Sequence, residues 1–162
     1  MRLDQYQTLS NTQKIGMQSS RKKFSQSLHD KFDPPARKAV TDWIKMKWGL
    51  SCIPNPNVYG VDLIVLREGN PVGFVEVEVR NWAYCHYPTI HLGQRKDKLL
   101  AKDLPVLFFA LTQDLNHAYW MKIDKSKRYP LIEVKNFEVP NGEMFYDIPV
   151  TEFKYVDLTE PF

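Results

Sequence analysis

Three carboxylates, Asp62, Glu76 and Glu78, lie inside the predicted strands of a mostly apolar hairpin between Asp62 and Arg80, and together they could bind a metal ion. The stretch is mostly Val, Ile, Leu and Phe, which is typical of buried strands, where an uncompensated carboxylate is costly. Because side chains alternate along a strand, Glu76 and Glu78 share one face and the intervening valines share the other. Carboxylate oxygens are the ligands that hard divalent cations prefer. We therefore expect a site for Mg²⁺, with Mn²⁺ as a substitute.

Asp62 can join the two glutamates only if the hairpin between them has the right register. The residues at 68–71 have turn composition and place Asp62 near the start of the partner strand. A strict two-residue turn at Gly69–Asn70 would pair Asp62 with Val77 and put the acids on opposite faces. The metal-site hypothesis therefore predicts a three- or five-residue loop, or a β-bulge, within Leu66–Val72.

Length and composition indicate a globular protein. The chain has 162 residues, of which 43% are hydrophobic and 25% are charged, so one domain with a substantial core is the simplest expectation. It has only two cysteines, no apolar run of about 20 residues and no apolar signal-peptide core at the N-terminus. These features favour a cytoplasmic, intracellular protein without a membrane partner.

The charge is unevenly distributed. Residues 1–48 contain ten Lys and Arg against four Asp and Glu, and residues 49–162 contain twelve against fifteen, which gives +6 and −3 and sums to the net +3. A basic N-terminal third suits a polyanionic partner such as DNA. A solvated basic face explains the charge alone equally well.

The expected elements frame the acidic stretch. Residues 1–23 are predicted to form a polar, basic arm, and residues 24–162 a single domain. A short helix should close at Asp33, which would then cap a second helix from Pro34 to Trp48. Its apolar face is Ala36, Val40, Trp43 and Ile44, with Lys47 on the same stripe. Further predicted elements are a strand at 50–53, the hairpin, a helix at about 92–102, a nearly wholly apolar strand at 105–111, and strands at 117–123, 130–134 and 144–148.

The order helix, three strands, helix, strand over residues 36–111 resembles the PD-(D/E)xK nuclease superfamily. Val61-Asp62 matches its proline–aspartate element, and Glu76-Val77-Glu78 matches its (D/E)-x-K element in an E-x-E version. The resemblance implies an α/β fold with a restriction endonuclease-like αβββαβ core, a central mixed sheet and a β-rich C-terminal extension. The alternative register, Glu78-Val79-Arg80, ends in an arginine, which stays charged and is a poor proton acceptor.

The resemblance also implies roles for individual residues. Asp62 and Glu76 would bind Mg²⁺ together with the Val77 carbonyl, and Glu78 would orient the attacking water or hold a second metal. Lys96, Lys47 or Arg80 would replace the missing motif lysine. The residues expected to contact the nucleic acid are Arg80, Gln94, Arg95, Lys98 and Lys47.

Together these features predict a Mg²⁺-dependent endonuclease that hydrolyses DNA phosphodiester bonds. A homing-type or restriction-like enzyme and a junction resolvase, encoded by a phage or mobile element, both fit. A homodimer is expected where both strands must be cut, because one active site faces one strand. The alternative is a catalytically inactive nucleic-acid-binding or assembly protein on the same fold, since Glu78 departs from the family pattern.

Overall fold

The computed structural model describes residues 26–57, 60–135, 137 and 140–159, with side chains described from residue 34 onward apart from those of 95, 98, 100 and 101. The predicted arm at 1–23 lies outside these residues. In chain order the elements are α1 (Gln26–Trp48), β1 (Ser51–Pro54), β2 (Leu63–Arg67), β3 (Asn70–Val79), β4 (Thr89–Gly93), the 3-10 helix η3 (Gln94–Ala101), β5 (Val106–Leu111), β6 (His117–Lys122), β7 (Leu131–Val134), β8 (Glu143–Pro149), the 3-10 helix η4 (Val150–Glu152) and β9 (Lys154–Asp157).

The fold is α/β with a mixed central sheet. The strand order of this sheet is β1-β2-β3-β5-β6-β9, and a smaller sheet has the order β4-β8-β7. Strands β3 and β5 are parallel, and the other neighbouring strands are antiparallel. The connection from β3 to β5 passes through β4 and η3, as a parallel pair requires a crossover. No helix within the described residues is long and apolar enough to cross a membrane.

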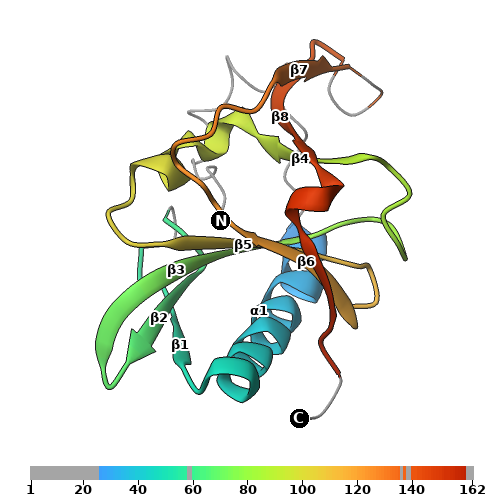
Figure 1. Cartoon of the computed structure of the whole chain (residues 1–162). Helices are drawn as coiled ribbons and strands as arrows, with labels where there is room; N and C mark the ends of the chain where they lie inside the picture. Colours follow the sequence, from blue (N-terminus) through green and yellow to red (C-terminus); the bar gives the residue numbers. More distant parts are fainter. Residues whose placement is uncertain (1–25, 58–59, 136, 138–139, 160–162) are drawn as a thin grey trace.

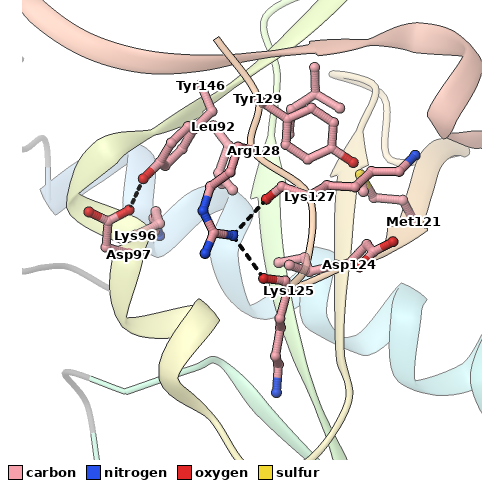
Figure 2. A pocket seen from close by; sticks show the side chains of 12 residues that line it. Leu92, Lys96, Asp97, Met121, Asp124, Lys125, Lys127, Arg128, Tyr129 and Tyr146 are labelled. Atoms are coloured by element: carbon pink, nitrogen blue, oxygen red, sulfur yellow. Dashed lines mark hydrogen bonds between the residues drawn. The ribbon is translucent and has the colours of Figure 1, made fainter. Parts of the chain in front are cut away.

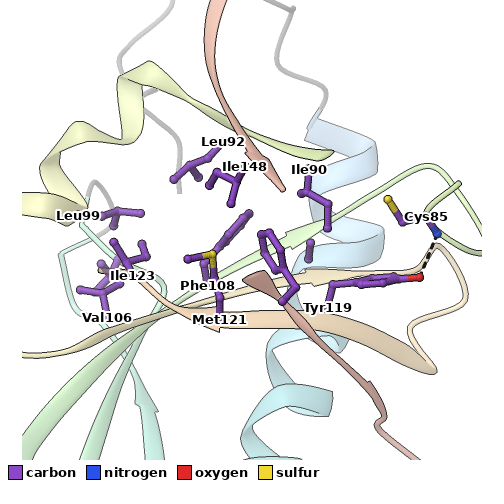
Figure 3. Close-up of a cluster of buried hydrophobic side chains, with 13 residues drawn as sticks. Cys85, Ile90, Leu92, Leu99, Val106, Phe108, Tyr119, Met121, Ile123 and Ile148 are labelled. Atoms are coloured by element: carbon purple, nitrogen blue, oxygen red, sulfur yellow. Dashed lines mark hydrogen bonds between the residues drawn. The ribbon is translucent and has the colours of Figure 1, made fainter. Parts of the chain in front are cut away.

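Figure 1 shows α1 on one face of the central sheet and the small sheet on the other, and an apolar core lies beneath each of them. Helix α1 covers one face, where Ala36, Val40, Trp43 and Ile44 are buried against β2, β3 and β5 as the helical spacing predicted. The small sheet and η3 cover the other face. Figure 3 shows Ile90, Leu92, Leu99 and Ile148 packing there over Phe108 and Met121 of the central sheet. Strand β3 is therefore covered on both sides, which explains its continuous hydrophobicity.

Helix α1 does not break where the sequence indicated. We expected two helices separated at Asp33, but α1 runs continuously from Gln26 to Trp48 with Pro34 and Pro35 inside it. A proline removes one N–H donor and usually ends or kinks a helix, yet its fixed φ is helical. The expectation that Asp33 caps a second helix is therefore wrong.

The segment before β5 also differs from the prediction. The helix expected at about 92–102 is a 3-10 helix from Gln94 to Ala101, and Thr89–Gly93 forms β4 instead. The residues Ile90 and Leu92 are buried while His91 between them is partly exposed, which is the alternation of a strand. Pairing of β4 with β8 thus takes Leu92 and Gly93 away from the predicted helix.

The β2–β3 hairpin has the bulge that the metal-site hypothesis requires. Its tight turn is at Glu68–Gly69, where both residues have positive φ, of 50° and 81°. The pairing Leu66↔Pro71 then shifts to Val65↔Gly73, so Val72 is the extra residue. The prediction of a three- or five-residue loop or a β-bulge within Leu66–Val72 is confirmed, and the structure has the bulge.

Candidate active site

The bulge places Asp62 and Glu76 on one face of the sheet. Leu63 pairs with Val75 in the shifted register, so the residue before Leu63 is opposite Glu76. Without the extra residue, Asp62 would be opposite Val75 and would point toward α1. The Asp62 side chain is buried, and its Oδ2 accepts a hydrogen bond from the Val77 N–H at 2.7 Å. This bond holds the Asp62 carboxylate against the peptide that follows Glu76.

Glu76 is the most deeply buried acid of the site. Its side chain is fully buried at the middle of β3, next to Phe108 of the parallel strand β5. Its Oε2 accepts a hydrogen bond from Lys96, and its Oε1 is buried with no hydrogen-bond partner in the described part of the chain. A buried carboxylate oxygen without a partner is costly, so it marks a place where a cation or another donor would be stabilised.

Lys96 reaches the acids from η3. Its side chain is only 10% exposed, and its ammonium contacts Glu76 directly and lies 3.5 Å from Glu78 Oε2. Of the three cations considered as replacements for the motif lysine, Lys96 is the one whose ammonium contacts Glu76. The site thus combines Asp62 from the residue before β2, Glu76 from β3 and Lys96 from η3.

Arg80 fixes Glu78 rather than Glu76. Its Nη2 donates to Glu78 Oε1 at 2.6 Å and to the His91 carbonyl oxygen at 2.5 Å, and both charged side chains are 22% exposed. These contacts tie the end of β3 to β4. The Arg80 guanidinium is thus engaged within the protein. Its expected contact with nucleic acid remains a prediction.

The pKa values of the two buried carboxylates, Glu76 and Asp62, shift in opposite directions. Burial raises the pKa of Glu76; the Lys96 charge lowers it and the Asp62 charge raises it, with a net upward shift. Burial also raises the pKa of Asp62, but the Lys96 charge and the Val77 N–H are among the interactions that lower it, and the net shift is downward.

Asp62 and Glu76 meet part of what a site for a hard divalent cation requires. Glu76 supplies a buried oxygen without a partner, and Asp62 lies beside it, so the available donors are oxygens, as Mg²⁺ prefers. Within the described residues, however, no three Asp, Glu, His or Cys side chains converge as a ligand group. Lys96 and Arg80 both contact the Glu78 carboxylate, so this third acid is already paired with cations. Metal ligation by the Val77 carbonyl remains a prediction.

Comparison with family models, curated proteins and solved structures finds no significant match. The case for a function therefore depends on the geometry of the site.

The remaining residues predicted to contact nucleic acid lie on two elements, η3 and α1. Gln94 is half-buried at the start of η3, and Arg95 and Lys98 belong to the same 3-10 helix as Lys96. Lys47 is exposed near the end of α1, which covers the other face of the sheet. The expectation that Lys47 lies beside the acids is therefore wrong, because the helical stripe it extends packs against the valine face of β3.

A cavity next to Lys96 was not expected from the sequence. Its volume is about 330 Å³, and Figure 2 shows Tyr129, Tyr146 and Arg128 around it. Tyr146 lies on β8, and its hydroxyl donates to Asp97 of η3, so residues 49 positions apart form one wall. No local pattern identifies such a cavity, since its lining comes from β4, η3, β6, β8 and the loop after β6.

Proposed function

We propose that the chain is a metal-dependent endonuclease that hydrolyses DNA phosphodiester bonds on a restriction endonuclease-like core. The observation that carries the proposal is the buried group of Asp62, Glu76 and Lys96. Burying two carboxylates and an ammonium in an apolar core is seldom favourable for stability alone. Buried carboxylates whose pKa is shifted by burial and by a specific charged partner are typical of functional sites.

Each residue of the site would have its own role in hydrolysis. Asp62 and Glu76 would hold the cation, which when bound activates a water and neutralises charge on the phosphoryl oxygens. The Lys96 ammonium, held by Glu76 and close to Glu78, would donate hydrogen bonds to the phosphate or to the attacking water. Arg80 keeps Glu78 oriented at the open end of β3. The protein then provides a fixed, largely dry setting for an in-line attack.

The test is cleavage of supercoiled plasmid, linear duplex and a four-way junction in Mg²⁺, Mn²⁺ or EDTA. We expect cutting that requires the metal and falls by at least about 100-fold in Glu76→Gln. The matched control is Glu133→Gln, an exposed glutamate on β7, which should cut like the wild type. Metal-independent cutting, or equal cutting by Glu76→Gln, would contradict the proposal. Preference for the junction would select a resolvase among the nuclease classes.

A second candidate is a nucleic-acid-binding protein without catalysis. The observation that favours it is the contact of the Lys96 ammonium with both glutamates, since an internal cation can replace a metal. Such a protein would bind DNA equally well in Mg²⁺ and EDTA, and Glu76→Gln would leave its dissociation constant unchanged or lower it. The nuclease would instead show metal-dependent cutting in the same samples.

A further inference from the structure

The cavity beside Lys96 is lined by apolar, aromatic and charged side chains. Its floor is apolar, with Leu92, Met121, Ile123 and Ile148, and two tyrosines stand on its sides. Four cations also line it, together with the carboxylates of Asp97 and Asp124; the cations are Lys96, Lys125, Lys127 and Arg128. Flat apolar and aromatic walls with nearby positive charge suit a base attached to a phosphate.

The tyrosines are held in fixed positions. The Tyr129 hydroxyl donates to Glu152 Oε1 at 3.1 Å, and the Tyr146 hydroxyl donates to Asp97 Oδ1. Both contacts anchor the outer end of a ring whose body packs against the apolar core. An aromatic ring that is already immobile loses little conformational entropy when a base stacks on it.

Arg128 is positioned by its own loop. Its Nη1 donates to the carbonyl oxygens of Lys125 and Lys127 at 3.0 and 3.1 Å, and in Figure 2 its side chain lies between the two tyrosines. A planar guanidinium can stack on a base or pair with a phosphate. The side chain is exposed at the cavity, so a ligand could reach it from solvent.

The cavity and the candidate active site share Lys96. This residue lines the cavity, and its ammonium contacts Glu76. A nucleotide seated in the cavity would therefore present its phosphate close to the carboxylates. A volume of about 330 Å³ is at the small end for ligand pockets, so it suits one nucleotide rather than a stacked base pair.

We propose that this cavity receives an unpaired nucleotide of the DNA strand that is cut, so that the protein prefers substrates with unpaired nucleotides beside the scissile phosphate. The inference rests on the proposed nuclease function. It names the substrate class as DNA with a bulged, flapped or otherwise unpaired nucleotide, since a base inside a continuous duplex would first have to unstack.

Fluorescence of 2-aminopurine tests this inference without cleavage. The base analogue is placed either in a one-nucleotide bulge or in a fully paired duplex of the same sequence, and each DNA is titrated with the Glu76→Gln protein in Mg²⁺. We expect binding of the bulged DNA at least about tenfold tighter than binding of the duplex, with quenching of the analogue. Tyr129→Leu and Tyr146→Leu should each remove about tenfold of this preference.

Two further variants keep the test decisive. Tyr87→Leu changes an exposed tyrosine outside the cavity and should leave the preference intact. Arg128→Gln changes an exposed side chain and should weaken the preference even where a tyrosine variant fails to fold. Metal-dependent cutting with equal binding of both DNAs, or a preference unchanged by all three cavity variants, would overturn the inference while the nuclease stands. A tyrosine-dependent preference without any cutting would support the cavity and reject the nuclease.

Discussion

The two faces of β3 are equally buried but chemically different. On one face, Val75 and Val77 are buried beneath α1 in a uniformly apolar core. On the other, Glu76 is equally buried but contacts an ammonium and leaves one oxygen without a partner. The valine face stabilises the fold by removing apolar surface from water. The glutamate face costs stability, which indicates that its residues serve a function.

Removing Lys96 should have the largest effect on stability. Lys96→Met leaves Glu76 buried beside Asp62 without its cation, and breaking such a pair costs about 3–5 kcal/mol in free energy of unfolding. Because a divalent cation would supply the lost charge, Mg²⁺ should restore part of the loss. Urea denaturation with Mg²⁺ or EDTA measures both quantities.

The control for this prediction is Lys38→Met, which breaks an exposed pair with Asp42 on α1. Its loss should stay within about 0.5 kcal/mol and should not respond to Mg²⁺. If Lys96→Met were as stable as the wild type, the ion pair would not be the compensating interaction that we infer.

A cavity made on the valine face should lower the stability of the fold and leave its activity unchanged. Ile44→Ala, in the fully buried seam between α1 and the sheet, should cost about 2–5 kcal/mol in free energy of unfolding. The glutamate face is untouched, so the specific activity of the folded fraction should equal that of the wild type. Cleavage assays well below the unfolding temperature check this. A loss of activity greater than the loss of folded protein would mean that the two faces are coupled.

Periodicity and apolar content predicted much of the fold. The buried face of α1, the hairpin and the apolar strand β5 all follow from local spacing, and these elements are confirmed. The bulge also followed from the sequence, because acids 14 residues apart can share a face in a hairpin only in certain registers. The position of the bulge at Val72 could not be predicted. A tight turn at Glu68–Gly69 followed by a bulge gives Asp62 the same register as a longer loop without a bulge.

Long-range packing decided what the sequence left open. Three cations were candidates for the motif lysine, and only the crossover through β4 and η3 brings Lys96 to Glu76. The sequence did not predict β4, because its five residues are a short stretch of alternating burial directly before the helical segment Gln94–Ala101. The cavity beside Lys96 is lined by residues from β4, η3, β6 and β8, and no local pattern shows that these segments meet.

The smallest expected effect is a difference in pH dependence between the wild type and Glu76→Gln. The pKa of Glu76 is raised above its ordinary value of 4.5, because burial disfavours the charged form. The folded state therefore holds a proton that the unfolded state releases, so Glu76 contributes stability below pH 4.5 that is lost as the pH rises through the raised pKa. The glutamine variant cannot lose a proton there, and it should gain stability relative to the wild type as the pH rises. Urea denaturation of both proteins from pH 4.5 to about 8 measures this difference. A difference that stays constant across the range would mean that Lys96 compensates the Glu76 charge fully, and that the glutamate face costs the fold no more than the valine face does.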